Sequence, residues 1–95
     1  MPNLRFVLRA RVNTDAPGAV RPVLERLAFG GTVRSGEGAG EFRVEAEMEG
    51  PSARELNRSF LSELRRAERR TRLRAEWSRK GVTERFFDYV PKGKS

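Results

Sequence analysis

Hydrophobic and polar residues alternate along several parts of the chain, with the period of two that is typical of strands with one buried face. In residues 41–49, for example, Phe42, Val44 and Ala46 alternate with charged residues. Turns rich in glycine separate the alternating segments from one another. The strands predicted in this way span residues 4–12, 32–35, 41–49, 72–79 and 82–90.

A short helix is predicted between the first two strands, because apolar residues recur there at intervals of three and four. Pro22 has no backbone N–H and is best tolerated in the first turn of a helix. We therefore expect this helix to start near Ala19 or Val20 and to end before Gly30.

A longer helix is predicted between the third and fourth strands. Ser52 and Glu55 have the spacing of a capping box, which starts a helix. The helical pattern continues to about Arg69. The apolar residues expected to face the core are Ala53, Leu56, Phe60, Leu64 and Ala67.

The order of the predicted elements, β-α-β-β-α-β with one more strand at the end, is typical of the ferredoxin-like sandwich of two layers. We expect an α+β fold of this kind in a single domain covering residues 1–95, with a polar tail from about 91–95. A chain of this length buries one modest core.

The same architecture predicts the charges on the open face of the sheet. Its first strand lies between the third and the fourth. Arg5, Arg9 and Arg11 would then lie opposite the glutamates of residues 41–49. We expect the open face to be a ladder of opposite charges that pair across neighbouring strands.

The composition excludes several kinds of active site. The chain has no cysteine and no histidine, which removes thiol nucleophiles, disulfides, Cys/His zinc sites and His-based acid–base catalysis. The glycine-rich loop 36–40 lacks the Lys-Ser/Thr pair of a phosphate-binding loop and precedes a strand. We expect a protein that is not an enzyme, with no catalytic residue, no metal site and no cofactor.

The net charge of +7 indicates an acidic partner. Our candidate contacts with an RNA or DNA backbone lie on the long helix, on the face opposite its predicted core residues: Arg54, Arg58, Arg65 and Arg69. The alternative is an ordinary solvated helix face. Arginine is frequent throughout the chain, and glutamates of the same helix could pair with these side chains.

Aromatic residues favour an interface over base stacking on the central strands. RNA-recognition motifs stack bases on aromatic side chains of those strands, and the outward positions here are mostly Arg and Glu. Phe86 and Phe87 are neighbours on a strand and must face opposite ways, so one of them is predicted to be exposed. With Tyr89 they mark the C-terminal edge strand as a possible homodimer interface.

The turn between the first strand and the first helix reads Asp15-Ala16-Pro17-Gly18-Ala19-Val20. It resembles the Asp-x-Pro-Gly-x-Leu turn of ACT domains, which are small ligand-sensing modules, and the resemblance covers residues 4–76. It implies side-by-side pairing of domains and binding of an amino acid or another small effector at their interface, near Asp15, Pro17 and Gly18. The same residues are also common in ordinary turns at the start of helices.

Three functions are compatible with these features. The leading hypothesis is a small, basic, non-enzymatic module that binds the backbone of RNA or DNA. The alternatives are an ACT-like dimer that senses an amino acid, and an adaptor subunit that binds an acidic protein. Neither a signal peptide nor a membrane-spanning segment is recognisable, so a cytoplasmic location is expected.

Overall fold

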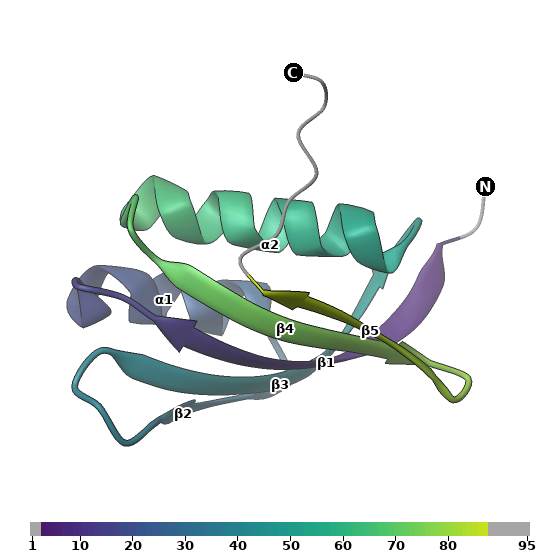
Figure 1. Cartoon of the computed structure of the whole chain (residues 1–95), viewed down its shortest axis with the longest axis horizontal. Helices are drawn as coiled ribbons and strands as arrows, with labels where there is room; N and C mark the ends of the chain where they lie inside the picture. Colours follow the sequence, from purple (N-terminus) through teal and green to yellow (C-terminus); the bar gives the residue numbers. More distant parts are fainter. Residues whose placement is uncertain (1–2, 88–95) are drawn as a thin grey trace.

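The computed structural model describes residues 3–87, which form two helices and a five-stranded antiparallel sheet. The elements are β1 (Leu4–Asn13), α1 (Pro17–Leu27), β2 (Thr32–Ser35), β3 (Glu41–Gly50), α2 (Ala53–Ala67), β4 (Arg72–Arg79) and β5 (Val82–Phe87). The strands follow the order β2-β3-β1-β4-β5 across the sheet (Figure 1). The predicted α+β class is confirmed, and β1 lies between β3 and β4 as expected.

Both helices pack on the same face of the sheet (Figure 1). Along β1, every second residue from Phe6 to Val12 is buried, and the residues between them are exposed. Successive residues of a strand point to opposite faces, so the second face of the sheet is open to solvent. Its side chains are polar or charged apart from Val7 and Phe87.

Helix α1 begins earlier than the sequence predicted. Pro17 occupies its first position, where a missing N–H costs nothing, and the N–H groups of Ala19 and Val20 both donate to the carbonyl of Ala16, at 3.0 and 3.1 Å. Pro22 therefore lies inside the helix and not in its first turn. The prediction was wrong because Pro17 already holds the position that we assigned to Pro22.

Helix α2 starts as predicted and ends slightly early. The hydroxyl of Ser52 accepts a hydrogen bond from the N–H of Glu55 at 3.1 Å, which confirms Ser52 as the N-cap. The last helical residue is Ala67, so Arg69 lies beyond the helix.

The buried side of α2 is rotated relative to the predicted one. Asn57 and Leu61 are buried, although neither was expected in the core, and Leu56 is only partly buried. Asn57 is accommodated because its Oδ1 accepts a hydrogen bond from Nε1 of the buried Trp77 at 3.2 Å. Phe60 packs edge-on against the same indole ring, with 6.2 Å between ring centroids. These contacts anchor α2 on β4.

Two hairpins complete the sheet. The first joins β2 to β3 through residues 36–40, as predicted. The second joins β4 to β5 through Lys80 and Gly81, which both have positive φ, at 52° and 82°. Two central residues with positive φ form the turn whose twist matches a β-hairpin. Tyr89, the predicted end of the last strand at residue 90 and the tail at 91–95 lie outside the described residues.

Candidate functional site

The open face of the sheet is electrostatically different at its two ends. At one end, Arg5 donates to Oε2 of Glu49 at 2.8 Å and to Oε1 of Glu47 at 3.3 Å. The hydrogen bond and the charge of Glu49, with a smaller contribution from Glu47, raise the pKa of the Arg5 guanidinium above its ordinary value. The predicted pairing of opposite charges is therefore present here, and we call these three residues the paired end.

At the other end, arginines face arginines. Arg11 on β1 lies opposite Arg43 on β3 and opposite Arg74 on β4, and Arg43 in turn lies opposite Arg34 on β2. The expectation that Arg11 faces a glutamate is thus wrong, because Arg43 interrupts the glutamates of β3 at this position. We call Arg34, Arg43, Arg11 and Arg74 the arginine row.

In the described part of the chain, the arginine row forms no ion pair with an acid. Within residues 3–87, no carboxylate oxygen lies within 4 Å of any of its guanidinium nitrogens. All four side chains are exposed. Neighbouring strands are about 4.8 Å apart, so four cations are held side by side, and like charges directly opposite each other destabilise a sheet. An anion that binds here would reduce this repulsion. The guanidinium groups of the row supply the N–H donors for it.

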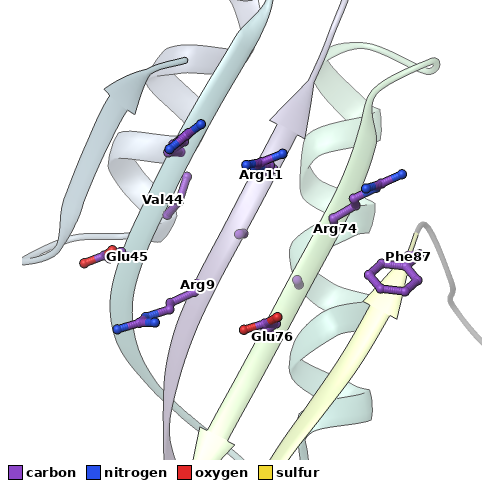
Figure 2. A pocket seen from close by; sticks show the side chains of 10 residues that line it. Arg9, Arg11, Val44, Glu45, Arg74, Glu76 and Phe87 are labelled. Atoms are coloured by element: carbon purple, nitrogen blue, oxygen red, sulfur yellow. The ribbon is translucent and has the colours of Figure 1, made fainter. Parts of the chain in front are cut away.

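The arginine row ends at an aromatic side chain. Phe87 on β5 lies opposite Arg74, whose guanidinium carbon is 5.5 Å from the centre of the phenyl ring. Figure 2 shows Arg11, Arg74 and Phe87 on three adjacent strands, all on the same face of the sheet. As the sequence predicted, one of the two neighbouring phenylalanines is exposed: Phe87 is 61% accessible and Phe86 is 9% accessible.

An open depression of about 470 Å³ covers the middle of the row. Its charged and aromatic lining residues are four arginines, two glutamates and a phenylalanine: Arg9, Arg11, Arg43, Arg74, Glu45, Glu76 and Phe87. Figure 2 shows all of them except Arg43 with labels. Glu76 already accepts a hydrogen bond from Nε of Arg85 at 3.0 Å. The depression is shallow and solvated, so it suits a charged, extended ligand better than a small apolar one. Guanidinium groups bind phosphate through two parallel N–H donors.

The four arginines predicted from the sequence occupy the other layer. Arg54, Arg58 and Arg65 lie on α2, and Arg69 follows its end. Arg54, Arg65 and Arg69 are exposed, and Arg58 is partly buried. Arg58 and Arg65 lie beside the buried side of α2, because buried Leu61 is three residues after Arg58 and four before Arg65. Nε of Arg65 also donates to the carbonyl of Thr71 at 3.1 Å.

The residues of the ACT-like resemblance lie in the turn between β1 and α1. Asp15 is exposed and borders an open depression of about 460 Å³ together with Arg70 and Arg72. Pro17 and Gly18 belong to the first turn of α1 and do not line this depression. A methyl group at Gly18 would meet no atom within 4 Å, so packing does not require a glycine there.

A buried hydroxyl pair holds this turn. Thr14 Oγ1 accepts hydrogen bonds from the N–H of Ala16 and from Oγ1 of Thr71, both at 3.2 Å. The N–H of Thr14 donates to the carbonyl of Gly40 at 2.9 Å. The end of β1, next to the arginine row, is therefore fixed in position.

Comparison with protein-family models, curated proteins and solved structures gives no match for this chain. In the described part of the chain, neither helix has the length and apolar character to span a membrane. Among residues 3–87, no three acidic side chains are grouped closely enough to hold a metal ion.

Proposed function

We propose that this protein is a non-enzymatic binding module for the phosphate backbone of RNA or DNA, and that the arginine row is its main contact surface. The observation that carries the proposal is the alignment of four exposed arginines that form no ion pair with any acid among residues 3–87. Such a row has an electrostatic cost for the folded protein. A polyanion that binds across it removes this cost and releases its own counterions.

The second candidate surface for the same function consists of three arginines of α2 and one that follows it: Arg54, Arg58, Arg65 and Arg69. One of them, Arg65, is engaged by the backbone of Thr71, and they belong to the helical layer instead of the open sheet face. The row is favoured because neighbouring strands fix its members in one line. Arg54, Arg58, Arg65 and Arg69 remain a competing interface that the same experiment can test.

The salt dependence of binding distinguishes these surfaces. We would measure fluorescence anisotropy of labelled single-stranded RNA and duplex DNA at several salt concentrations between 50 and 200 mM. Four phosphate contacts predict a slope of log K against log salt of roughly −2.8 to −3.6, and therefore a loss of about 50- to 150-fold over this range.

Two sets of variants complete this experiment. Replacing Arg11, Arg43 and Arg74 together by Gln is expected to reduce the slope by about 2 to 3. The matched variant, with Gln at Arg54, Arg58 and Arg65, also loses three positive charges and should keep the slope. Absence of binding at 50 mM salt, or loss of binding only in the matched variant, would contradict the proposal.

A second function is favoured by one specific observation. Asp15 borders the same depression as Arg70 and Arg72, so a carboxylate and two guanidinium groups are available for the ammonium and carboxylate of an amino acid. An ACT-like sensor would bind its ligand there. A thermal-shift screen of the amino acids tests this function, which requires one of them to raise the melting temperature and Asp15→Asn to abolish the rise.

The third function, an adaptor for an acidic protein, uses the same electrostatic attraction as nucleic-acid binding. A titration with polyglutamate separates the two, because carboxylates accept a guanidinium but provide no base or ribose. Equal affinity for polyglutamate and RNA at matched charge would favour the adaptor.

We also propose a ferredoxin-like sandwich extended by β5, a homodimer and a cytoplasmic location. The central place of β1 supports the first proposal. Among the described strands, β5 pairs with β4 alone, which leaves an edge able to pair with a second copy. Sedimentation equilibrium tests the dimer directly.

A further inference from the structure

We propose that the arginine row binds single-stranded nucleic acid in preference to a duplex, with one unpaired base stacked on Phe87. This inference rests on the proposed function and specifies its substrate class. It depends on the position of Phe87, which lies next in line after Arg74 on the same face of the sheet.

Phe87 is available for stacking. Its side chain is 61% accessible, whereas that of the adjacent Phe86 is buried against the core. Arg74 lies over the ring of Phe87 at 5.5 Å, and a guanidinium plane is itself a stacking surface for bases. The end of the arginine row therefore presents an aromatic ring and a cationic plane together.

The length of the row suits an extended chain. From β2 to β5 there are four strand spacings, or about 19 Å at about 4.8 Å each. A backbone crossing the sheet in this direction meets four arginines and then the phenyl ring of Phe87. A positively charged groove with an aromatic stacking platform is the usual combination in proteins that bind single strands without sequence preference.

A duplex cannot use the aromatic end of the row. Its bases are stacked between their neighbours, so the base faces that Phe87 would contact become accessible only when the strand is unpaired. Both described helices cover the opposite face of the sheet, so the open face has no helix to insert into a groove of the duplex (Figure 1). Phe87 thus adds affinity for single strands alone.

The stacking is limited to one edge of the sheet. The remaining described side chains of the open face are aliphatic only at Val7 and otherwise polar or charged. This arrangement differs from an RNA-recognition motif, which uses aromatic residues of its central strands. We infer that one base stacks and that sequence selectivity is weak.

The test compares four labelled probes of equal length: single-stranded RNA, single-stranded DNA, an abasic single strand with the same phosphates, and a DNA duplex. The proteins are the wild type, Phe87→Leu and the control Phe29→Leu. Phe29 is 90% exposed and follows α1, outside the row. Melting temperatures and circular dichroism confirm that each variant is folded.

Phe87→Leu is expected to weaken binding of both base-bearing single strands by about 5- to 150-fold. Its affinity for the abasic strand and the duplex, and the salt dependence of binding, should not change. Phe29→Leu should bind all four probes like the wild type.

Three outcomes would overturn this inference. They are an unchanged affinity of Phe87→Leu for the single strands, an equal loss on all four probes, and wild-type binding to the duplex that matches its binding to single strands. If the abasic strand still binds with the expected salt dependence, the proposed function survives and only the inference fails. If the wild type binds none of the probes, both fail.

Discussion

The two ends of the open sheet face both carry exposed arginines, but the residues opposite these arginines differ in charge. At the paired end, Arg5 bonds to Glu47 and Glu49. In the arginine row, Arg11 has arginines on both sides. An exposed arginine is therefore structural or available according to the residue on the neighbouring strand. Strand register decides which of the two it is.

The largest expected effect comes from making the row resemble the paired end. Arg11→Glu removes one cation from the row. It also places an acid between Arg43 and Arg74, where it can pair with them. Nucleic-acid affinity should fall about tenfold or more, since hydrogen bonds to charged groups contribute about 1.5 to 3 kcal/mol. The slope of log K against log salt should fall by about 1.4 to 1.8. Both quantities come from anisotropy titrations.

Arg5→Gln is the control for this variant, because Arg5 belongs to the paired end. Its binding curve should match that of the wild type. A loss of affinity in Arg5→Gln as large as that in Arg11→Glu would show that the distinction between the two ends has no functional meaning.

A change in the core should lower the stability of the protein without changing how the arginine row binds nucleic acid. Asn57→Leu leaves the buried Nε1–H of Trp77 without its acceptor, so urea denaturation should show a loss of about 1 to 3 kcal/mol in the free energy of unfolding. The folded variant should bind nucleic acid with an unchanged salt slope. A changed slope would mean that the row depends on α2.

The matched variant for this experiment is the double change Asn57→Leu with Trp77→Phe. It removes both polar partners, which is less costly than leaving one of them buried and unpaired. Because phenylalanine is smaller than tryptophan, the cavity left at residue 77 also lowers the free energy of unfolding. If Asn57→Leu alone were as stable as the wild type, the hydrogen bond would not be what keeps Asn57 in the core.

The smallest expected effect is a change in stability that depends on the charges opposite a single arginine of β1. Arg11→Thr removes the repulsion between Arg11 and its two like-charged neighbours, Arg43 and Arg74. It also introduces a residue that favours strands. It should raise the melting temperature slightly at low salt, and the gain should shrink as salt screens the repulsion. Arg9→Thr is the matched change on the same strand and face, opposite Glu45 and Glu76. Its gain should be smaller, because threonine has the same strand propensity there but the variant loses two opposite-charge neighbours. Equal gains in both variants would contradict the account of the row.

Local patterns in the sequence were sufficient to predict much of the fold. The alternation of residues located β2 and β4 at the residues where the structure has them, and Ser52 was identified as a cap from its spacing to Glu55. The exposure of one phenylalanine in the pair at 86 and 87 followed from strand geometry alone. These features depend on residues that are close together in the chain.

The arginine row could not be predicted in the same way, because it depends on pairings between distant residues. Arg43 was visible as an interruption among glutamates, but only the register of β1 against β3 places it opposite Arg11. The burial of Asn57 likewise depends on Trp77, twenty residues later. The candidate site was therefore placed on α2, where helical periodicity makes neighbours visible in the sequence.

The most direct test of the central claim is to observe the arginine side chains themselves. We would record the Nε–Hε NMR signals of the arginines during titration with a single-stranded oligonucleotide at low salt. The account predicts that the signals of Arg11, Arg43 and Arg74 shift with the bound fraction while that of Arg5 does not move. Shifts confined to Arg54, Arg58, Arg65 and Arg69, or no shift at saturating oligonucleotide, would contradict it.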